Sequence, residues 1–199
     1  MQRGLLFPSL IPVKGIWQAV VLISLGVAMV HAGDAAKAFG WDPPKVAQSV
    51  FTHDLGMLDS EREEYATNLA GLAVNQIVAA KATPASMADA RRMIALALHL
   101  SPRNKRALVA NFQLSKGVLP DVSETDYSPQ VFARLLLARG QLLEKQGGDE
   151  NRSLARMFVQ LAAGMDPKNE DAIYVCEVQR LDHGDIDWSV ITDGPAKKP

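Results

Sequence analysis

The stretch SPRN at residues 101–104 recurs as DPKN at residues 166–169, 65 positions further along the chain. A proline followed two residues later by asparagine is typical of a helix end and of the capping residue that starts the next helix. Both stretches follow apolar side chains at helical spacing. These are Met93, Leu96, Ala97 and Leu100 in the first copy, and Phe158, Leu161, Ala162 and Met165 in the second. The two stretches therefore mark the same helix junction in two copies of one unit.

The recurrence extends well beyond this junction. Over about fifty positions at the same offset, ten residues are identical, and they are mainly alanines, leucines and helix-capping residues. The pairs include Leu72 and Leu137, Ala73 and Ala138, Ala97 and Ala162, and Asn104 and Asn169. No part of the chain alternates between apolar and polar residues with a period of two. The sequence therefore predicts an all-α fold made of two related three-helix units.

Local signals place the helix boundaries. Ser60 and Glu63 have the spacing of a capping box and predict a helix over residues 61–81. Thr83 and Ser128, each followed by proline, predict the starts of two further helices, and residues 117–127 read as a loop. The first helix of each unit is expected to pack through one apolar face. The faces are Leu69, Leu72, Ala73 and Ala80, with Gln76 as a polar exception, and Val131, Leu135, Ala138 and Leu142.

The N-terminal residues have a different character from the helical units. Basic residues precede an apolar run over residues 15–30, and small residues lie around Ala32, which is the pattern of a secretory signal peptide. We therefore expect a signal peptide at 1–32, a tether at 33–58, a helical domain at 59–193 and a polar tail at 194–199. The protein is then periplasmic or secreted. In the alternative, residues 15–31 stay uncleaved and anchor the protein in the membrane.

The second unit resembles the closing half of a tetratricopeptide repeat. Ala162, the run Met165-Asp166-Pro167 and Asn169 match that motif, and both copies share a lengthened spacing relative to the family. The resemblance implies a right-handed α-solenoid of antiparallel helix pairs, whose concave surface binds a protein or peptide partner. Carried over position by position, it gives Arg134, Arg139 and Tyr174 as candidate groove residues.

Charge and motif content argue against several other functions. Without Arg3 and Lys14, 19 basic residues face 22 acidic ones, a net charge of about −3 that does not suit nucleic-acid binding. The sequence contains no nucleotide-binding, hydrolase or zinc-protease motif, so we predict no catalytic residue, no metal and no cofactor. The imidazoles of His53 and His183 lie beside carboxylates but lack further ligands at metal-binding spacing, and Cys176 has no disulfide partner.

The sequence thus favours an exported, non-enzymatic interaction module of the cell envelope. Two alternatives remain open. One is an accessory subunit of an envelope enzyme complex, with the chemistry on another chain. The other is a structural component that assembles with copies of itself.

Overall fold

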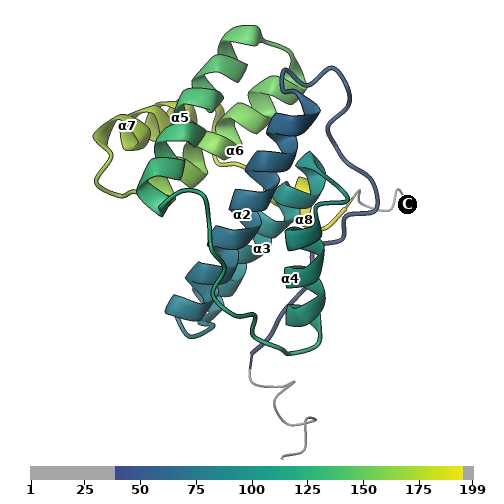
Figure 1. Cartoon of the computed structure of the whole chain (residues 1–199). Helices are drawn as coiled ribbons and strands as arrows, with labels where there is room; N and C mark the ends of the chain where they lie inside the picture. Colours follow the sequence, from purple (N-terminus) through teal and green to yellow (C-terminus); the bar gives the residue numbers. More distant parts are fainter. Residues whose placement is uncertain (1–38, 195–199) are drawn as a thin grey trace, which may run out of the picture. The chain divides into compact units, whose positions relative to one another are not determined.

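The computed structural model describes residues 39–194, and within this range the chain forms seven α-helices and no strand (Figure 1). The all-α fold predicted from the sequence is confirmed. Two helical hairpins, α2 with α3 and α5 with α6, form its frame. The helices are α2 (Asp59–Ala79), α3 (Pro84–Leu100), α4 (Lys105–Ser115), α5 (Pro129–Gln146), α6 (Asp149–Met165), α7 (Glu170–His183) and α8 (Ser189–Thr192).

The 65-residue recurrence is visible in the helix boundaries. Adding 65 to the bounds of α3 gives those of α6, and α7 likewise begins 65 residues after α4. The capping geometry repeats as well. The Asn104 side chain accepts a hydrogen bond from Ala107 N at 3.0 Å, and Asn169 accepts one from Ala172 N at 3.1 Å. Each cap satisfies a backbone N–H that the first helical turn leaves free. The junction between the second and third helices, with its asparagine cap, is therefore the same in both units.

Aromatic side chains join the two units. The ring of Tyr65 on α2 stacks on Phe158 of α6 at a centroid distance of 5.3 Å and meets Phe132 of α5 at 5.6 Å. Tyr127, at the end of the connecting loop, also stacks on Phe132, at a centroid distance of 6.1 Å. Burial also raises the pKa of Tyr65 to about 12, with the carboxylate of Glu61 adding to the effect. The two units therefore share one core.

The third helices of the two units are placed differently. Helix α4 packs against both α2 and α3, whereas α7 packs mainly against α6. As a result Ala172 is the one fully buried residue of α7, while Tyr174 and Leu181 are more than two thirds exposed. The repeated sequence thus gives two copies of the hairpin but two different environments for the helix that follows it.

Residues 39–58, the described part of the predicted tether, contain no helix and pack against the helical domain. Phe51, Leu55 and Met57 are buried in the helical core. Near the other end of this segment, Lys45 N donates a hydrogen bond to the carbonyl oxygen of Thr192 at 2.8 Å. The segment therefore links the C-terminal helix α8, which the sequence did not predict, to the rest of the fold.

Several local predictions are confirmed and two are wrong. Thr83 and Ser128 cap α3 and α5 as predicted. Ser60 is not a cap, because α2 begins at Asp59, two residues before the predicted start, with Leu58 as its N-cap and no capping side chain. The expected packing face of α5 is also wrong, since Val131 and Leu142 are more than 40% exposed. The buried residues of α5 are Phe132, Ala133, Leu136, Leu137, Gly140 and Leu143.

The expected signal peptide and the polar tail after residue 194 lie outside the described residues. Within residues 39–194, no helix combines the length and the apolar character that crossing a bilayer requires. The prediction of an uncleaved anchor falls on residues 15–31 and stays a prediction.

Candidate functional site

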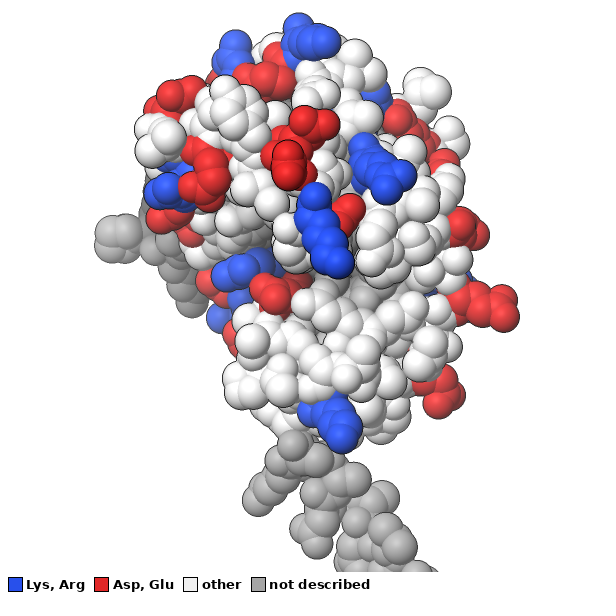
Figure 2. Space-filling model, turned by 90° about the vertical axis from the view of Figure 1, so that its left-hand side faces the viewer, with Lys and Arg blue, Asp and Glu red and all other residues white. Residues whose placement is uncertain are grey.

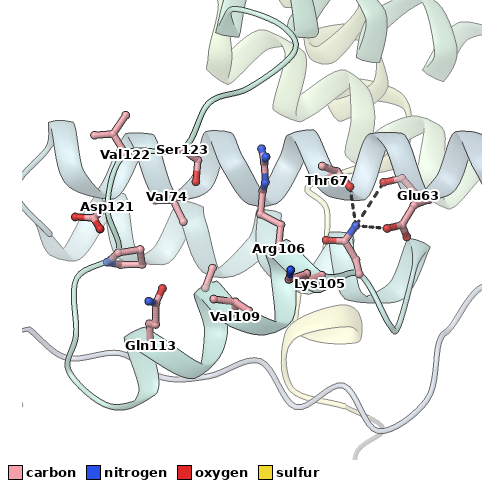
Figure 3. Close-up of a pocket in the computed structure, with 13 residues that line it drawn as sticks. Glu63, Thr67, Val74, Lys105, Arg106, Val109, Gln113, Asp121, Val122 and Ser123 are labelled. Carbon is pink, nitrogen blue, oxygen red and sulfur yellow. Dashed lines mark hydrogen bonds between the residues drawn. The ribbon is translucent and has the colours of Figure 1, made fainter.

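A groove of about 560 Å³ lies between α2, α4 and the loop that follows α4 (Figure 3). We call it the α2–α4 groove. Helix α2 contributes Glu63, Thr67 and Val74, and the other walls come from α4 and from the loop. The lining residues of α4 are Lys105, Arg106, Val109, Ala110 and Gln113, preceded by the cap Asn104, and those of the loop are Pro120, Asp121, Val122 and Ser123.

A network of hydrogen bonds closes one end of the groove. The amide nitrogen of Asn104 donates to Thr67 Oγ1 at 2.7 Å and to Glu63 Oε1 at 2.9 Å, as the dashed lines in Figure 3 show. The other oxygen of Glu63 accepts a hydrogen bond from Ser101. Asn104 is almost fully buried, so these contacts satisfy a polar group that burial would otherwise destabilise. This end of the groove is therefore a rigid, polar junction between α2 and α4.

The opposite part of the groove has an apolar rim. Val109 on α4 and Val122 on the loop line the groove and are 46% and 69% exposed. Phe112, one turn along α4 from Val109, is 63% exposed. Large apolar side chains that gather at an open groove mark a binding surface more often than isolated ones do. The groove thus combines a charged, hydrogen-bonded end with an apolar edge.

The loop over residues 118–127, which we call the strap, is held on α2 mainly by two asparagine side chains. Asn75 Nδ2 donates to the carbonyl oxygen of Ser123 at 2.9 Å, and Ser123 N donates to Asn75 Oδ1 at 2.8 Å. Seven residues earlier on the helix, Asn68 accepts from Asp126 N at 3.3 Å and donates to the carboxylate of Asp126 at 3.2 Å. The side chains at residues 68 and 75 therefore lie on one face of α2 and pair with an extended backbone.

Gly71 allows the strap to approach α2 closely. A Cβ atom at this position would lie 2.7 Å from Thr125 Cγ2 and 2.8 Å from Arg106 Nη1. From α4, Arg106 Nη1 donates to the carbonyl oxygen of Glu124 at 2.7 Å. The strap is thus held between α2 and a side chain of α4.

A second hollow, of about 590 Å³, lies on the other side of the strap. Val122 lines both hollows, so the strap separates them. The second hollow is lined by α2, by Pro129 at the start of α5 and by the end of α6, and its walls are mainly apolar. Its lining residues are Leu72, Asn75, Gln76, Val78, Ala79, Val122, Thr125, Pro129, Gly164 and Met165.

The three residues carried over from the resemblance do not form one site. Arg139 is largely buried and makes an internal ion pair, with Nη2 2.6 Å from Glu61 Oε2 and 2.6 Å from the carbonyl oxygen of Gly56. Arg134 is exposed on the same helix, and Tyr174 is 72% exposed on α7. None of the three lines the α2–α4 groove. Arg139 therefore holds the start of α2 against α5.

The remaining titratable candidates are dispersed. His53 and His183 are exposed, and no group of three or more His, Cys, Asp or Glu side chains between residues 39 and 194 is arranged to hold a metal ion. Cys176 is half-buried, and burial, with a further contribution from the Glu177 carboxylate, raises the pKa of its thiol. A raised pKa leaves little reactive thiolate at neutral pH.

Comparison with protein-family models, with curated proteins and with solved structures yields no match. The site is therefore defined by its geometry. The sequence contained one usable signal, namely Asn68 and Asn75, which lie seven residues apart at the two ends of an apolar stretch over residues 69–74, a spacing that places both amides on one face of the helix. It did not indicate which segment these amides contact.

Proposed function

We propose that this protein is a non-enzymatic interaction module that binds a protein or peptide partner in the α2–α4 groove. The proposal rests on one observation, the open groove of about 560 Å³ whose apolar rim remains exposed. Its two helical walls, α2 and α4, are joined by the hydrogen bonds of Asn104, so a partner loses little free energy in ordering them.

The chemistry of the groove suits a peptide. Val109 and Val122 offer contacts to apolar side chains, while Lys105 and Asp121 offer charges of both signs along the same groove. Protein interfaces likewise combine apolar contacts with polar ones. Charges of both signs are also interspersed over the face shown in Figure 2, without a continuous basic stripe. This distribution supports a protein partner over a nucleic acid.

The location of the module is part of the proposal. The signal-peptide pattern of residues 1–32 supports export to the periplasm or beyond. The partner is then expected among envelope or secreted proteins, and the membrane is involved only if the N-terminal segment is uncleaved.

A selection from a library of random peptides against the full chain tests the groove. Val109→Asp places a carboxylate on the apolar rim and should weaken the selected peptides by at least about tenfold, because burying an unpaired charge is unfavourable. Leu142→Asp is the matched control, since Leu142 is exposed to the same extent, in the C-terminal part of α5. The proposal fails if no peptide binds the wild type, or if both variants bind the selected peptides equally well.

Helix α7 favours a second candidate, a component that assembles with copies of itself or joins an envelope complex. Its outer face exposes Ile173, Tyr174, Val178 and Leu181. Light scattering on the purified full chain, with Leu181→Asp alongside, separates the two candidates. Self-assembly predicts a wild-type oligomer that the substitution dissociates, whereas a monomeric wild type rules out assembly through α7.

A further inference from the structure

The strap has the conformation of a bound peptide. Its residues alternate between half-buried Ser123, Thr125 and Tyr127 and exposed Val122, Glu124 and Asp126. Such an alternation is that of an extended chain lying on a surface. Within residues 39–194 there is no strand with which it could pair. The amide side chains of Asn75 and Asn68 take the place of a neighbouring strand.

We propose that the strap occupies, in cis, a binding site for an extended peptide on α2, and that a partner's segment displaces it. The proposal rests on the interaction function proposed above and specifies its ligand and its regulation. In this view the protein is autoinhibited, and the partner must compete with the strap for the amides of Asn68 and Asn75.

The contacts define the chemistry of the ligand. Asn75 pairs with both the N–H and the C=O of Ser123, and Arg106 binds the C=O of Glu124. These contacts involve only main-chain groups of the bound segment, so they are compatible with many ligand sequences. Asn68 also binds the carboxylate of Asp126, and this contact favours an acidic residue three positions after the one that pairs with Asn75. The ligand is therefore an extended segment with an Asp or Glu at that position.

Two features make the strap displaceable. Between residues 118 and 127, Pro120 is the one buried residue, and the stacking of Tyr127 on Phe132 anchors only the C-terminal end of the strap. The hollows of about 560 and 590 Å³ on its two sides leave room for side chains larger than those of the strap. A polar, solvent-exposed segment of this kind opens at lower free energy than the helical core.

The test releases the strap by removing its two backbone donors. In the full chain, Ser123→Pro and Asp126→Pro together delete the N–H groups that pair with Asn75 and Asn68, and proline is compatible with an extended backbone. The probe is a fluorescein-labelled synthetic peptide with the sequence of residues 118–128. Its control is the same peptide carrying the two prolines. Binding is followed by fluorescence anisotropy, and helical content by circular dichroism.

The probe is expected to bind the double-proline variant on the order of a hundredfold more tightly than the wild type. In the wild type, the strap is attached to the same chain and competes with the probe for the site on α2 at an effective concentration in the millimolar range. Adding Asn75→Ala to the double-proline variant should abolish this binding, whereas adding Gln141→Ala, on the exposed face of α5, should leave it unchanged.

The proposal is overturned if the double-proline variant retains its helical content and yet binds the probe no more tightly than it binds the proline-containing control peptide. A variant that unfolds would also overturn it, because the strap would then be part of the core. These outcomes are independent of the library selection. If the wild type binds selected peptides in a way that Val109→Asp weakens, but the double-proline variant does not bind the probe, the interaction function stands and the autoinhibition is rejected.

Discussion

The imidazole Nδ1 of His99 accepts a hydrogen bond from the backbone N–H of Val50, at a nitrogen–nitrogen distance of 3.2 Å. The other ring nitrogen, Nε2, lies 3.0 Å from the carbonyl oxygen of Ile191. Because one partner is a donor and the other an acceptor, the ring fits both in its neutral form, with the proton on Nε2. His99 is 2% exposed. It therefore joins the N-terminal segment and α8 to the last turn of α3.

This geometry predicts a stability that depends on pH. Burial lowers the pKa of His99 from its ordinary value, and the hydrogen bond to Ile191 opposes the shift in part. The unfolded chain therefore takes up a proton before the folded chain does as the pH falls. The stabilisation by His99 should be fully present above about pH 6.5 and decrease as the pH falls from there towards the lowered folded-state pKa.

His99→Gln should accordingly lower the free energy of unfolding by about 1–3 kcal/mol at pH 7.5, because it disturbs two buried hydrogen bonds. The difference from the wild type should shrink at pH 5. Urea unfolding at both pH values measures it. The exposed His53 provides the control, and His53→Gln should have the same free energy of unfolding as the wild type at both pH values. A difference between His99→Gln and the wild type that does not change with pH would contradict the assignment.

Arg139 and Arg134 should behave differently although they lie on the same helix. Arg139→Ala removes the contacts with Glu61 and the carbonyl of Gly56, and it should cost about 2 kcal/mol of stability, the range of buried hydrogen bonds to charged groups. Arg134→Ala changes an exposed side chain, so its free energy of unfolding should stay within about 0.5 kcal/mol of that of the wild type. Urea unfolding of both variants tests this, and equal costs would show that the Arg139 contacts contribute no net stability.

The two equivalent capping residues should also differ. Asn169→Ala removes a helix cap and should cost about 1 kcal/mol. Asn104→Ala removes the same cap together with the hydrogen bonds to Glu63 and Thr67, and should cost about 2–3 kcal/mol. Thermal unfolding followed by circular dichroism ranks the two variants. The reverse order would mean that the junction between α2 and α4 is less important than the geometry indicates.

Gly71 and Gly164 provide a matched pair of substitutions, because only Gly71 lies against the strap. Gly71→Ala places a methyl group against Thr125 and Arg106, so it should push the strap outwards and cost about 1–3 kcal/mol. Gly164→Ala meets open space in a helix and should stabilise the protein by about 0.5–1 kcal/mol. Limited proteolysis after Glu124 should be faster for Gly71→Ala than for the wild type. Unchanged cleavage would indicate that α2 and the strap adjust together.

Local sequence signals predicted the helices well. Capping by Thr83, Ser128 and the asparagines at 104 and 169 depends on contacts within three residues along the chain. The predicted caps Thr83 and Ser128 are confirmed, and Asn104 and Asn169 cap the helices that follow the two repeated junctions. The packing face of α5 was wrong, because apolar residues follow one another so closely over residues 131–143 that more than one helical face fits the pattern. The neighbouring helices decide which face is buried.

The candidate site was less predictable than the fold. Arg139, chosen by resemblance, makes a structural ion pair, and the groove found instead depends on the segment of residues 118–127 folding back on α2. Its hydrogen bonds join residues 48 and 58 positions apart. No local pattern specifies such contacts, since either asparagine alone resembles an ordinary solvated side chain.

The sequence by itself determined that this protein is helical, that SPRN and DPKN mark equivalent junctions, and where most of the helices begin. These features depend on backbone hydrogen bonds and caps that form between residues close in the chain. Only the tertiary structure decided that α4 and α7 occupy different places, that residues 39–58 are packed against the core, and that the strap lies on Asn68 and Asn75. The reason is physical, because burial and long-range pairing depend on which surfaces meet, and the same repeated unit meets different neighbours in its two positions.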